Sequence, residues 1–339
     1  MTFASLKKAV NARKWPVLIV CLVLLVAAPI VIQHGLVLTV MIYIMLYSIL
    51  SMGDMVILGY GGMLNMGHTA FYGVGAYVSA LLALHTDLPF IACFLIAGIA
   101  AAIFGFLLSV PCLRVSADFL GLITLAFLEL FKAVVTNWTA VTRGPMGLVG
   151  IPSASLFGFE FNTQIRFYYL IFVVLILVYF ILSRMMKAPF GRALQATRDD
   201  EIGARAVGID VNRQKVYAFV VGAAVAGLAG SLFAHYVGFI APNSFALDAT
   251  LLITQMCILG GLGSLKGAIF GAAFFTIMPE IIRPLAEYRV GVGGVIMLLV
   301  ILIRPQGVLG SRAFAGKGGI FGNLGRQLKR RQAALVRRK

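Results

Sequence analysis

The sequence predicts an all-α, polytopic transmembrane helical bundle of about ten spans, with about eight to ten consistent with the pattern. Three observations support this fold class. Of the 339 residues, 61% are hydrophobic and 12% are charged, whereas an average soluble domain has about 25% charged residues. The chain is also too long for one core, because hydrophobic cores stop growing at about 250–300 residues. Apolar runs of about 20 residues, the length that crosses a bilayer, recur along it.

Ten apolar runs define the predicted elements in order. They are residues 16–33, 36–52, 56–84, 90–112, 119–138, 166–184, 216–236, 248–262, 267–284 and 289–303. The run 56–84 is too long for one simple helix and contains six glycines between 59 and 75. We therefore expect a bent or partly non-helical entry followed by a helix near 68–84. The run 16–33 resembles the apolar part of a signal peptide, but since the downstream chain is equally membrane-like, it is interpreted as a retained first helix.

The positive charge predicts the orientation. The formal net charge is +16, and most basic residues gather near the N-terminus, between 184 and 215, and in the tail from 304 onward. The positive-inside rule places such residues in the cytoplasm, which requires an even number of crossings. The predicted organisation is a cytoplasmic basic N-terminus (1–15), a transmembrane domain (16–303) with a cytoplasmic loop (187–215), and a basic cytoplasmic tail (304–339).

The same charge limits the expected partners. Basic patches can indicate nucleic acid, but these residues flank predicted spans, so we expect no nucleic-acid partner. In the tail, Leu324, Leu328 and Leu335 alternate with basic residues, which favours a helix lying on anionic membrane lipid. A disordered basic tail is the alternative.

Motifs of enzymes and metal sites are missing. The sequence contains no phosphate-binding G-x-x-x-x-G-K-[ST] loop, no H-E-x-x-H and no G-x-S-x-G. Cys21, Cys93, Cys112 and Cys257 lie in apolar stretches without a C-x-x-C pair, as buried free thiols do. We therefore expect no catalytic residue, bound metal or cofactor in this chain. If ATP drives its activity, another polypeptide binds the ATP and Mg²⁺.

The loop 187–215 carries signals for a short helix. Pro189 and Gly191 are predicted to break the preceding helix, and Thr197 with Asp200 resembles a capping box. Acidic residues at a helix start complement the helix dipole, and Gly208 stands where a C′ glycine would end the helix. This predicts a charged cytoplasmic helix of about two turns that docks on a partner. An ordinary solvated connection is the alternative.

This loop and most of the chain resemble a known family. The stretch GRALQATRDDEIGARAVGID is similar to the cytoplasmic coupling loop of branched-chain amino acid permeases of the LivM type, which belong to ATP-binding cassette importers. Similar stretches are GYGGMLNMGHTAFYGVGAY at 59–77, TLAFLEL at 124–130, NWTAVTRGPMGLVGIP at 137–152, FVVGAAVAGLAGSLFAHYVGFIAPNSF at 219–245 and ILGGLGSLKGAIFGAAF at 258–274. The sequence departs from the general importer pattern E-A-A-x-x-x-G, because Glu201 is followed by Ile202 and Gly203 and the glycine arrives one position late at Gly208. It also has Arg143 where a small residue is expected before Gly144.

The resemblance implies a transport system of several subunits in the bacterial inner membrane. A second, LivH-like permease subunit, two cytoplasmic ATPases and a periplasmic binding protein would be partners, and leucine, isoleucine or valine would be carried by alternating access. Urea or short amides are the alternative substrates. The residues expected to couple to the ATPases are Gly191, Arg192, Arg198, Asp199, Asp200, Glu201, Arg205, Gly208 and Asp210.

Polar residues within the apolar runs are candidates for the substrate path. Glu129 and Lys132 lie three apart in one predicted span, either as a functional ion pair or as a structural link between helices. Asn65 and His68 follow the glycine break, where a helix N-terminus could receive a carboxylate or pack closely on a neighbour. Gln255 is a further candidate. His235 and Asp248 are expected to be solvated near the outer surface.

Two other classes of transporter remain as alternatives. A carrier driven by an ion gradient normally needs acidic residues near the midplane, for which Glu129 is the available candidate. A passive channel would have no need of a docking helix.

Overall fold

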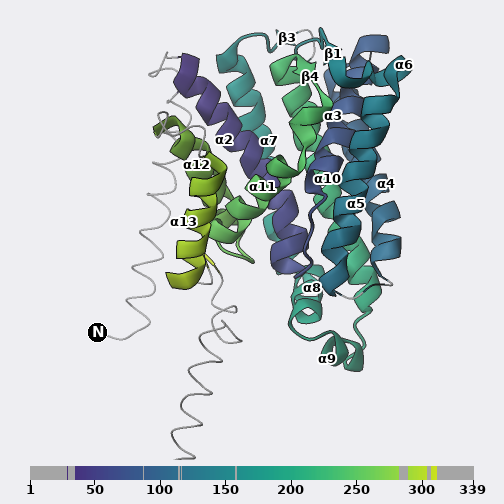
Figure 1. Cartoon of the computed structure of the whole chain (residues 1–339), viewed down its shortest axis with the longest axis vertical. Helices are drawn as coiled ribbons and strands as arrows, with labels where there is room; N and C mark the ends of the chain where they lie inside the picture. The colour runs from purple at the N-terminus through teal and green to yellow at the C-terminus, as the bar shows by residue number, and fades with distance from the viewer. Residues whose placement is uncertain are drawn as a thin grey trace, which may run out of the picture.

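The structure is a computed structural model that describes residue 29 and residues 35–310, except 87, 114, 116, 157–158, 282–288 and 304–306. It is a helical bundle with short strands at one end (Figure 1). The predicted N-terminal segment 1–15, most of the span 16–33 and the tail from 311 lie outside the described residues. The all-α class is confirmed.

Helices account for most of the described chain. They are α2 (Gly35–Asp54), α3 (His68–His85), α4 (Phe90–Cys112), α5 (Ala117–Asn137), α6 (Thr139–Thr142), α7 (Gln164–Lys187), α8 (Pro189–Asp199), α9 (Glu201–Ala206), α10 (Val211–Val237), α11 (Leu247–Gly260), α12 (Leu265–Ile281) and α13 (Arg289–Ile303). A π-helix, η1 (Met55–Tyr60), and two 3₁₀ turns, η2 (Gly144–Met146) and η3 (Pro242–Phe245), complete the helical elements.

Four two-residue strands in the described part of the chain form two small antiparallel sheets. In the first, β1 (Leu148–Val149) pairs with β4 (Phe239–Ile240), with Leu148 opposite Ile240. In the second, β2 (Ser155–Leu156) pairs with β3 (Phe159–Glu160), with Ser155 opposite Glu160. The first sheet joins the segment after α5 to the end of α10.

The chain is a multi-pass membrane protein. Among the described residues, 6 segments are long and apolar enough to cross a bilayer. They are Gly35–Tyr60, Phe90–Cys112, Phe119–Asn137, Gln164–Lys187, Val211–Val237 and Pro242–Gly260. The predicted total of about ten spans is not confirmed.

One predicted boundary was wrong. The predicted span 36–52 continues through the π-helix η1 as far as Tyr60, so residues 56–60 do not belong to the entry of the next element. The rest of that prediction is confirmed, because residues 61–67 are not regular helix and α3 begins at His68. The π-helix η1 therefore continues α2 at the glycines where the sequence suggested a break.

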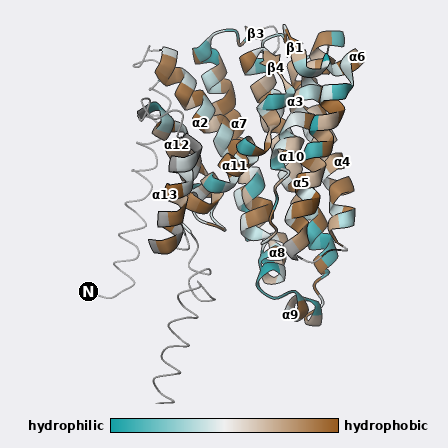
Figure 2. Cartoon of the chain, viewed as in Figure 1, coloured by the Kyte–Doolittle hydropathy of each residue, from teal (hydrophilic) through white to brown (hydrophobic). Residues whose placement is uncertain are grey.

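The long helix α10 lies at the centre of the bundle and packs on α2, α3 and α4. Its glycines allow close approach, as is typical of helix contacts in membranes. A Cβ on Gly230 would overlap the carbonyl oxygen of Tyr72, and one on Gly227 would lie 2.8 Å from that of Ala97. The outer helices instead expose apolar side chains such as Leu95 and Phe180, and hydrophobic colour covers much of α4 and α5 (Figure 2).

Candidate functional site

The segment that joins α7 to α10, residues 188–210, extends beyond one end of the bundle and is called here the protruding segment (Figure 1). It was expected to hold one helix, and it holds two, α8 and α9. Pro189 occupies the first turn of α8, where its missing N–H costs no hydrogen bond. Gly191 does not break a helix but lies within α8, packed so closely on the carbonyl of Met186 that a Cβ would overlap it.

The predicted capping box was wrong, although both ends of the charged helix were near their predicted places. Asp200 is the N-cap of α9, and its carboxylate accepts hydrogen bonds of 3.0 Å from the amides of Ile202 and Gly203. Thr197 belongs to α8 instead, because that helix continues to Asp199. Gly208 ends α9 with a φ of 84°, which is the left-handed conformation expected of a C′ glycine.

Ion pairs hold the protruding segment to the start of α10. Glu201 pairs with Lys215 at 2.5 Å and with Arg205 at 3.9 Å. Asp210 caps α10 by accepting from the amide of Arg213 at 3.1 Å and pairs with that side chain at 2.9 Å. The residues of these pairs are partly or largely solvent-accessible, so each pair contributes at most about 1 kcal/mol. They position the segment rather than stabilise the fold.

Two predicted coupling arginines have different surroundings. Arg192 is exposed and donates to the carbonyl of Lys187 at 3.1 Å. Arg198 points inward with 9% of its side chain exposed, and it contacts Asp199 at 2.8 Å and the carbonyl of Gly59 at 3.0 Å. The predicted set therefore contains residues that face away from the bundle and one that faces into it.

Two exposed apolar side chains of the protruding segment were not predicted from the sequence. Ile202 is 83% exposed and Val207 is 75% exposed, at the start and end of α9. Large apolar side chains this exposed outside the spans are typical of protein contacts when they lie together. The available signal was two aliphatic residues inside a capped, charged helix.

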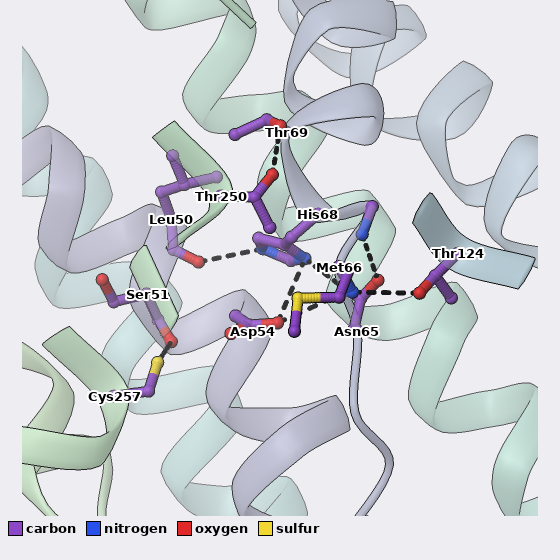
Figure 3. A network of polar contacts seen from close by, with 11 residues as sticks. Leu50, Ser51, Asp54, Asn65, Met66, His68, Thr69, Thr124, Thr250 and Cys257 are labelled. Carbon is purple, nitrogen blue, oxygen red and sulfur yellow. Dashed lines mark hydrogen bonds and ion pairs between the residues drawn. The ribbon is translucent and has the colours of Figure 1, made fainter. Parts of the chain in front are cut away.

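Asn65 lies at the centre of a second set of polar residues, buried within the bundle (Figure 3). Its amide nitrogen donates to the carboxylate of Asp54 at 3.4 Å and contacts Nδ1 of His68 at 3.2 Å. Its amide oxygen accepts from the N–H of Gly67 at 3.1 Å. Asp54, Asn65 and His68 are called here the polar hub, and each is at most 1% exposed.

The carbonyl of Leu50 fixes the tautomer of His68. It lies 3.1 Å from Nε2 and can only accept, so Nε2 carries the proton. Nδ1 is then free to accept from Asn65, whose two amide hydrogens serve His68 and Asp54. Oδ2 of Asp54 has no hydrogen-bond partner among the described residues. The hub is therefore organised around Asn65, which bonds to both other members.

Neighbouring hydrogen bonds tie the polar hub to three helices. The amide of Met66 donates to the hydroxyl of Thr124 on α5 at 2.9 Å. The hydroxyls of Thr69 on α3 and Thr250 on α11 are hydrogen-bonded to each other. The irregular residues 61–67 thus lead into a site where hydrogen bonds involve α3, α5 and α11 (Figure 3).

The remaining path candidates are not brought together. No ion pair within 4.0 Å joins Glu129 and Lys132 in the described part of the chain, and Glu129 is exposed on α5. Gln255 lies on α11 beside a cavity of about 430 Å³ that Asn243, Asp248 and Glu280 also line. Asn65 and His68 are buried, so neither is open to a ligand in this conformation.

His235 is buried, which corrects the prediction that it is solvated. Its Nδ1 lies 2.7 Å from the carbonyl of Pro152, and its Nε2 lies 2.9 Å from the hydroxyl of Ser79. That hydroxyl is 2.7 Å from the hydroxyl of Ser231. This second network links α3 and α10 to the strand-bearing end of the bundle. Asp248 is exposed.

The chain is similar to known permease components. It matches the family model described as the permease component of branched-chain amino acid transport systems over residues 36–303. It is 37% identical over 315 residues to the high-affinity branched-chain amino acid transport system permease protein LivM of Escherichia coli (strain K12), covering 86% of this chain and 74% of that protein.

More distant relatives carry related names. The chain is 26% identical over 278 residues to the probable branched-chain amino acid transport permease protein LivM of Methanocaldococcus jannaschii, covering 74% of this chain and 80% of that protein. It is 27% identical over 284 residues to the high-affinity branched-chain amino acid transport system permease protein LivH of Escherichia coli (strain K12), covering 78% and 91%. No solved structure matches the chain.

Proposed function

Because the chain belongs to the family of permease components of branched-chain amino acid transport systems, we propose that it is a membrane-spanning subunit of an ATP-binding cassette importer. In this proposal it carries leucine, isoleucine and valine across the bacterial inner membrane and has no catalytic activity. The observation that supports a driven transporter most strongly is the protruding segment, which presents the capped helix α9 beyond α8 at one end of the bundle (Figure 1).

The protruding segment is the proposed ATPase contact. Ile202 and Val207 expose their side chains beside the charged residues Glu201 and Arg205, a combination that suits a partly apolar contact with a polar rim. Two cytoplasmic ATPase subunits would bind ATP and Mg²⁺ and move this segment during hydrolysis. The basic residues at the same end, Arg184 among them, favour a cytoplasmic position for it.

A second permease subunit would cover the exposed face of α5. Glu129 lies on that face within a membrane-spanning helix, and an ionised carboxylate facing lipid there costs a few kcal/mol or more. A related subunit, LivH-like in sequence, would shield Glu129 or share a water-filled path with it. The proposed path therefore runs along α5, with Glu129 and Lys132 on or near it.

Gln255 provides a second section of the proposed path. Its cavity of about 430 Å³ offers amide groups from Gln255 and Asn243 and carboxylates from Asp248 and Glu280. Such groups suit the ammonium and carboxylate of an amino acid zwitterion, since they supply both acceptors and donors. A periplasmic binding protein would deliver the amino acid at the strand-bearing end, where Met146 and Phe159 are exposed.

The proposal is tested with the complete transporter in proteoliposomes that contain ATP. We expect uptake of labelled leucine that survives collapse of ion gradients, and no comparable uptake of labelled urea. Uptake of urea in place of leucine would move the substrate to short amides. Loss of leucine uptake on gradient collapse, with ATP present, would indicate a secondary carrier instead.

The docking surface has its own test. Ile202→Asp should reduce binding of the ATPase and ATP-dependent uptake by about tenfold or more, because a buried apolar contact would receive a charge. Asn212→Asp adds the same charge to an exposed position on α10 and should leave both unchanged. Equal behaviour of the two variants would contradict the proposed contact.

A further inference from the structure

We infer that Arg198 is a positioning residue that transmits movement of the protruding segment to the buried polar hub through residues 59–67. This inference rests on the proposed function, since an ATPase must move the segment. It assigns Arg198 an inward role, distinct from docking on the partner.

The first link is the contact between Arg198 and Gly59. Nη1 of Arg198 donates to the carbonyl of Gly59 at 3.0 Å, although the two residues lie 139 positions apart. Nε and Nη2 donate to one carboxylate oxygen of Asp199 at 3.1 and 2.8 Å. Asp199 thus orients the planar guanidinium, which offers several donors in a fixed geometry. A shift of α8 is passed to Gly59 without a flexible linker between them.

The second link is the turn at Gly62. Its φ of 69° is a conformation that favours glycine, and a Cβ there would overlap Cγ of Arg198. The stem of the arginine therefore packs on the turn while its head group holds the carbonyl of Gly59. Both contacts fall on the residues where the regular helix has ended or is widened into a π-helix.

The third link is the short chain from Gly62 to Asn65. Gly62 still donates to the carbonyl of Leu58 at 3.1 Å and Met63 to that of Ile57 at 3.1 Å, but residues 62–65 have no regular secondary structure. The turn at Gly62 is thus only three residues from Asn65, whose side-chain amide organises the polar hub. Irregular backbone can change conformation there without disrupting the ladder of α2 or α3.

A cavity beside the turn leaves room for such a displacement. It has a volume of about 120 Å³, and its lining includes Gly61, Gly62 and Met63 as well as Thr197 and Arg198. The hydroxyl of Thr197 is buried against it without a hydrogen-bond partner among the described residues. Close-packed interiors resist gradual deformation, whereas this junction is not filled.

The tightly packed hub would respond to that displacement as a unit. Asn65 bonds to Asp54, His68 and Gly67 together, so moving it changes partners on α2 and α3 at once. Coupling between distant sites needs a structural element that both can bias. The segment 59–67 is the proposed element, because Arg198 contacts one end and the polar hub holds the other.

The test uses the complete transporter in lipid nanodiscs and proteoliposomes, with Arg198→Ala as the variant. Arg184→Ala is the matched control, since Arg184 is an exposed arginine at the same end of the bundle. For Arg198→Ala we expect the leucine transported per ATP hydrolysed to fall about fivefold or more, with ATPase binding retained. Arg198→Lys, which keeps one donor, should recover part of this ratio.

Hydrogen exchange gives a second measurement, which a purely structural role would not change. In the unaltered transporter, trapping the ATP-bound state should alter exchange in a peptide covering residues 61–67. In Arg198→Ala this response should disappear, while the response of residues 201–207 persists. A persisting response at 61–67, or an unchanged ratio of leucine to ATP, would overturn the inference.

A variant on the other side of the contact checks the route. Gly62→Ala should lower the leucine-to-ATP ratio as Arg198→Ala does, and the double variant should be no worse than either, because both act on one contact. Additive effects would contradict a shared route. If the unaltered transporter neither moves leucine nor stimulates its ATPase, the proposed function itself fails, independently of Arg198.

Discussion

Asn65 donates to the carboxylate of Asp54 across a break in the helix, at 3.4 Å, and both side chains are buried. The same amide nitrogen serves His68 at 3.2 Å. One side chain thus joins the end of α2 to the start of α3, where no regular helix connects them.

This relationship predicts a large loss of stability for Asn65→Ala. Asp54 and His68 would each lose a buried donor, so we expect the free energy of unfolding to fall by about 2–4 kcal/mol. Reversible unfolding in mixed detergent micelles measures it. Asn162→Ala, at an exposed position, should change the value by less than about 0.5 kcal/mol. Equal effects of the two variants would show that the hydrogen bonds of the hub do not contribute to the free energy of unfolding.

Two helix glycines with different surroundings predict opposite effects of an added methyl group. Gly230→Ala should destabilise the bundle by about 1–3 kcal/mol, because the added methyl would overlap the carbonyl of Tyr72. Gly294→Ala should be neutral or stabilising by up to about 1 kcal/mol, because it lies in α13 with open space around it and alanine favours helix. Thermal denaturation in detergent compares them. A tolerated Gly230→Ala would mean that the two helices can separate at little cost.

The cap of α9 can be separated from the charge of Asp200. Asp200→Ala should lose about 1 kcal/mol of local stability, because the amides of Ile202 and Gly203 lose their acceptor. ATPase binding should weaken with it, whereas Asp200→Asn keeps the cap and should bind normally. Titration of the ATPase onto the reconstituted permease subunits measures both. Equal weakening by the two variants would assign the effect to charge.

The His235 network predicts a cost for Ser79→Ala. The side chain of His235 and the hydroxyl of Ser231 would both lose a contact with Ser79, so unfolding should become easier by about 1–3 kcal/mol. Ser183→Ala, at a partly exposed position, is the control and should have little effect. Chemical denaturation of both variants tests this. A neutral Ser79→Ala would indicate that water replaces the lost hydroxyl.

Much of the fold could be predicted from composition and periodicity. The helix predicted at 90–112 is α4 over the same residues, and the helix predicted near 68–84 is α3. Long apolar runs leave few alternatives, because lipid requires every backbone group to be bonded within the segment. The π-helix could not be predicted, since the glycines at 59–62 suggest a break, whereas η1 packs against α10 and α8, which lie far away in sequence.

The candidate sites were predicted unevenly. Local signals located the end of α9 at Gly208 but placed the cap at Thr197 instead of Asp200, because the capping pattern occurs at more than one position in this stretch. The direction of Arg198 and the burial of His235 depend on residues far away in sequence, Gly59 and Pro152 among them. Spacing along one helix carries no information on such partners.

The sequence by itself determined that this chain is a multi-pass membrane protein and that its charged segment ends a helix at Gly208, because those features follow from hydropathy and short-range backbone bonding. Only the tertiary structure decided which polar residues meet. Asp54 became part of a hub with Asn65 and His68, and Arg198 turned toward Gly59 rather than outward. The reason is that buried polar groups need hydrogen-bond partners. The helices that supply these partners are brought together by tertiary packing, which short-range sequence patterns do not predict.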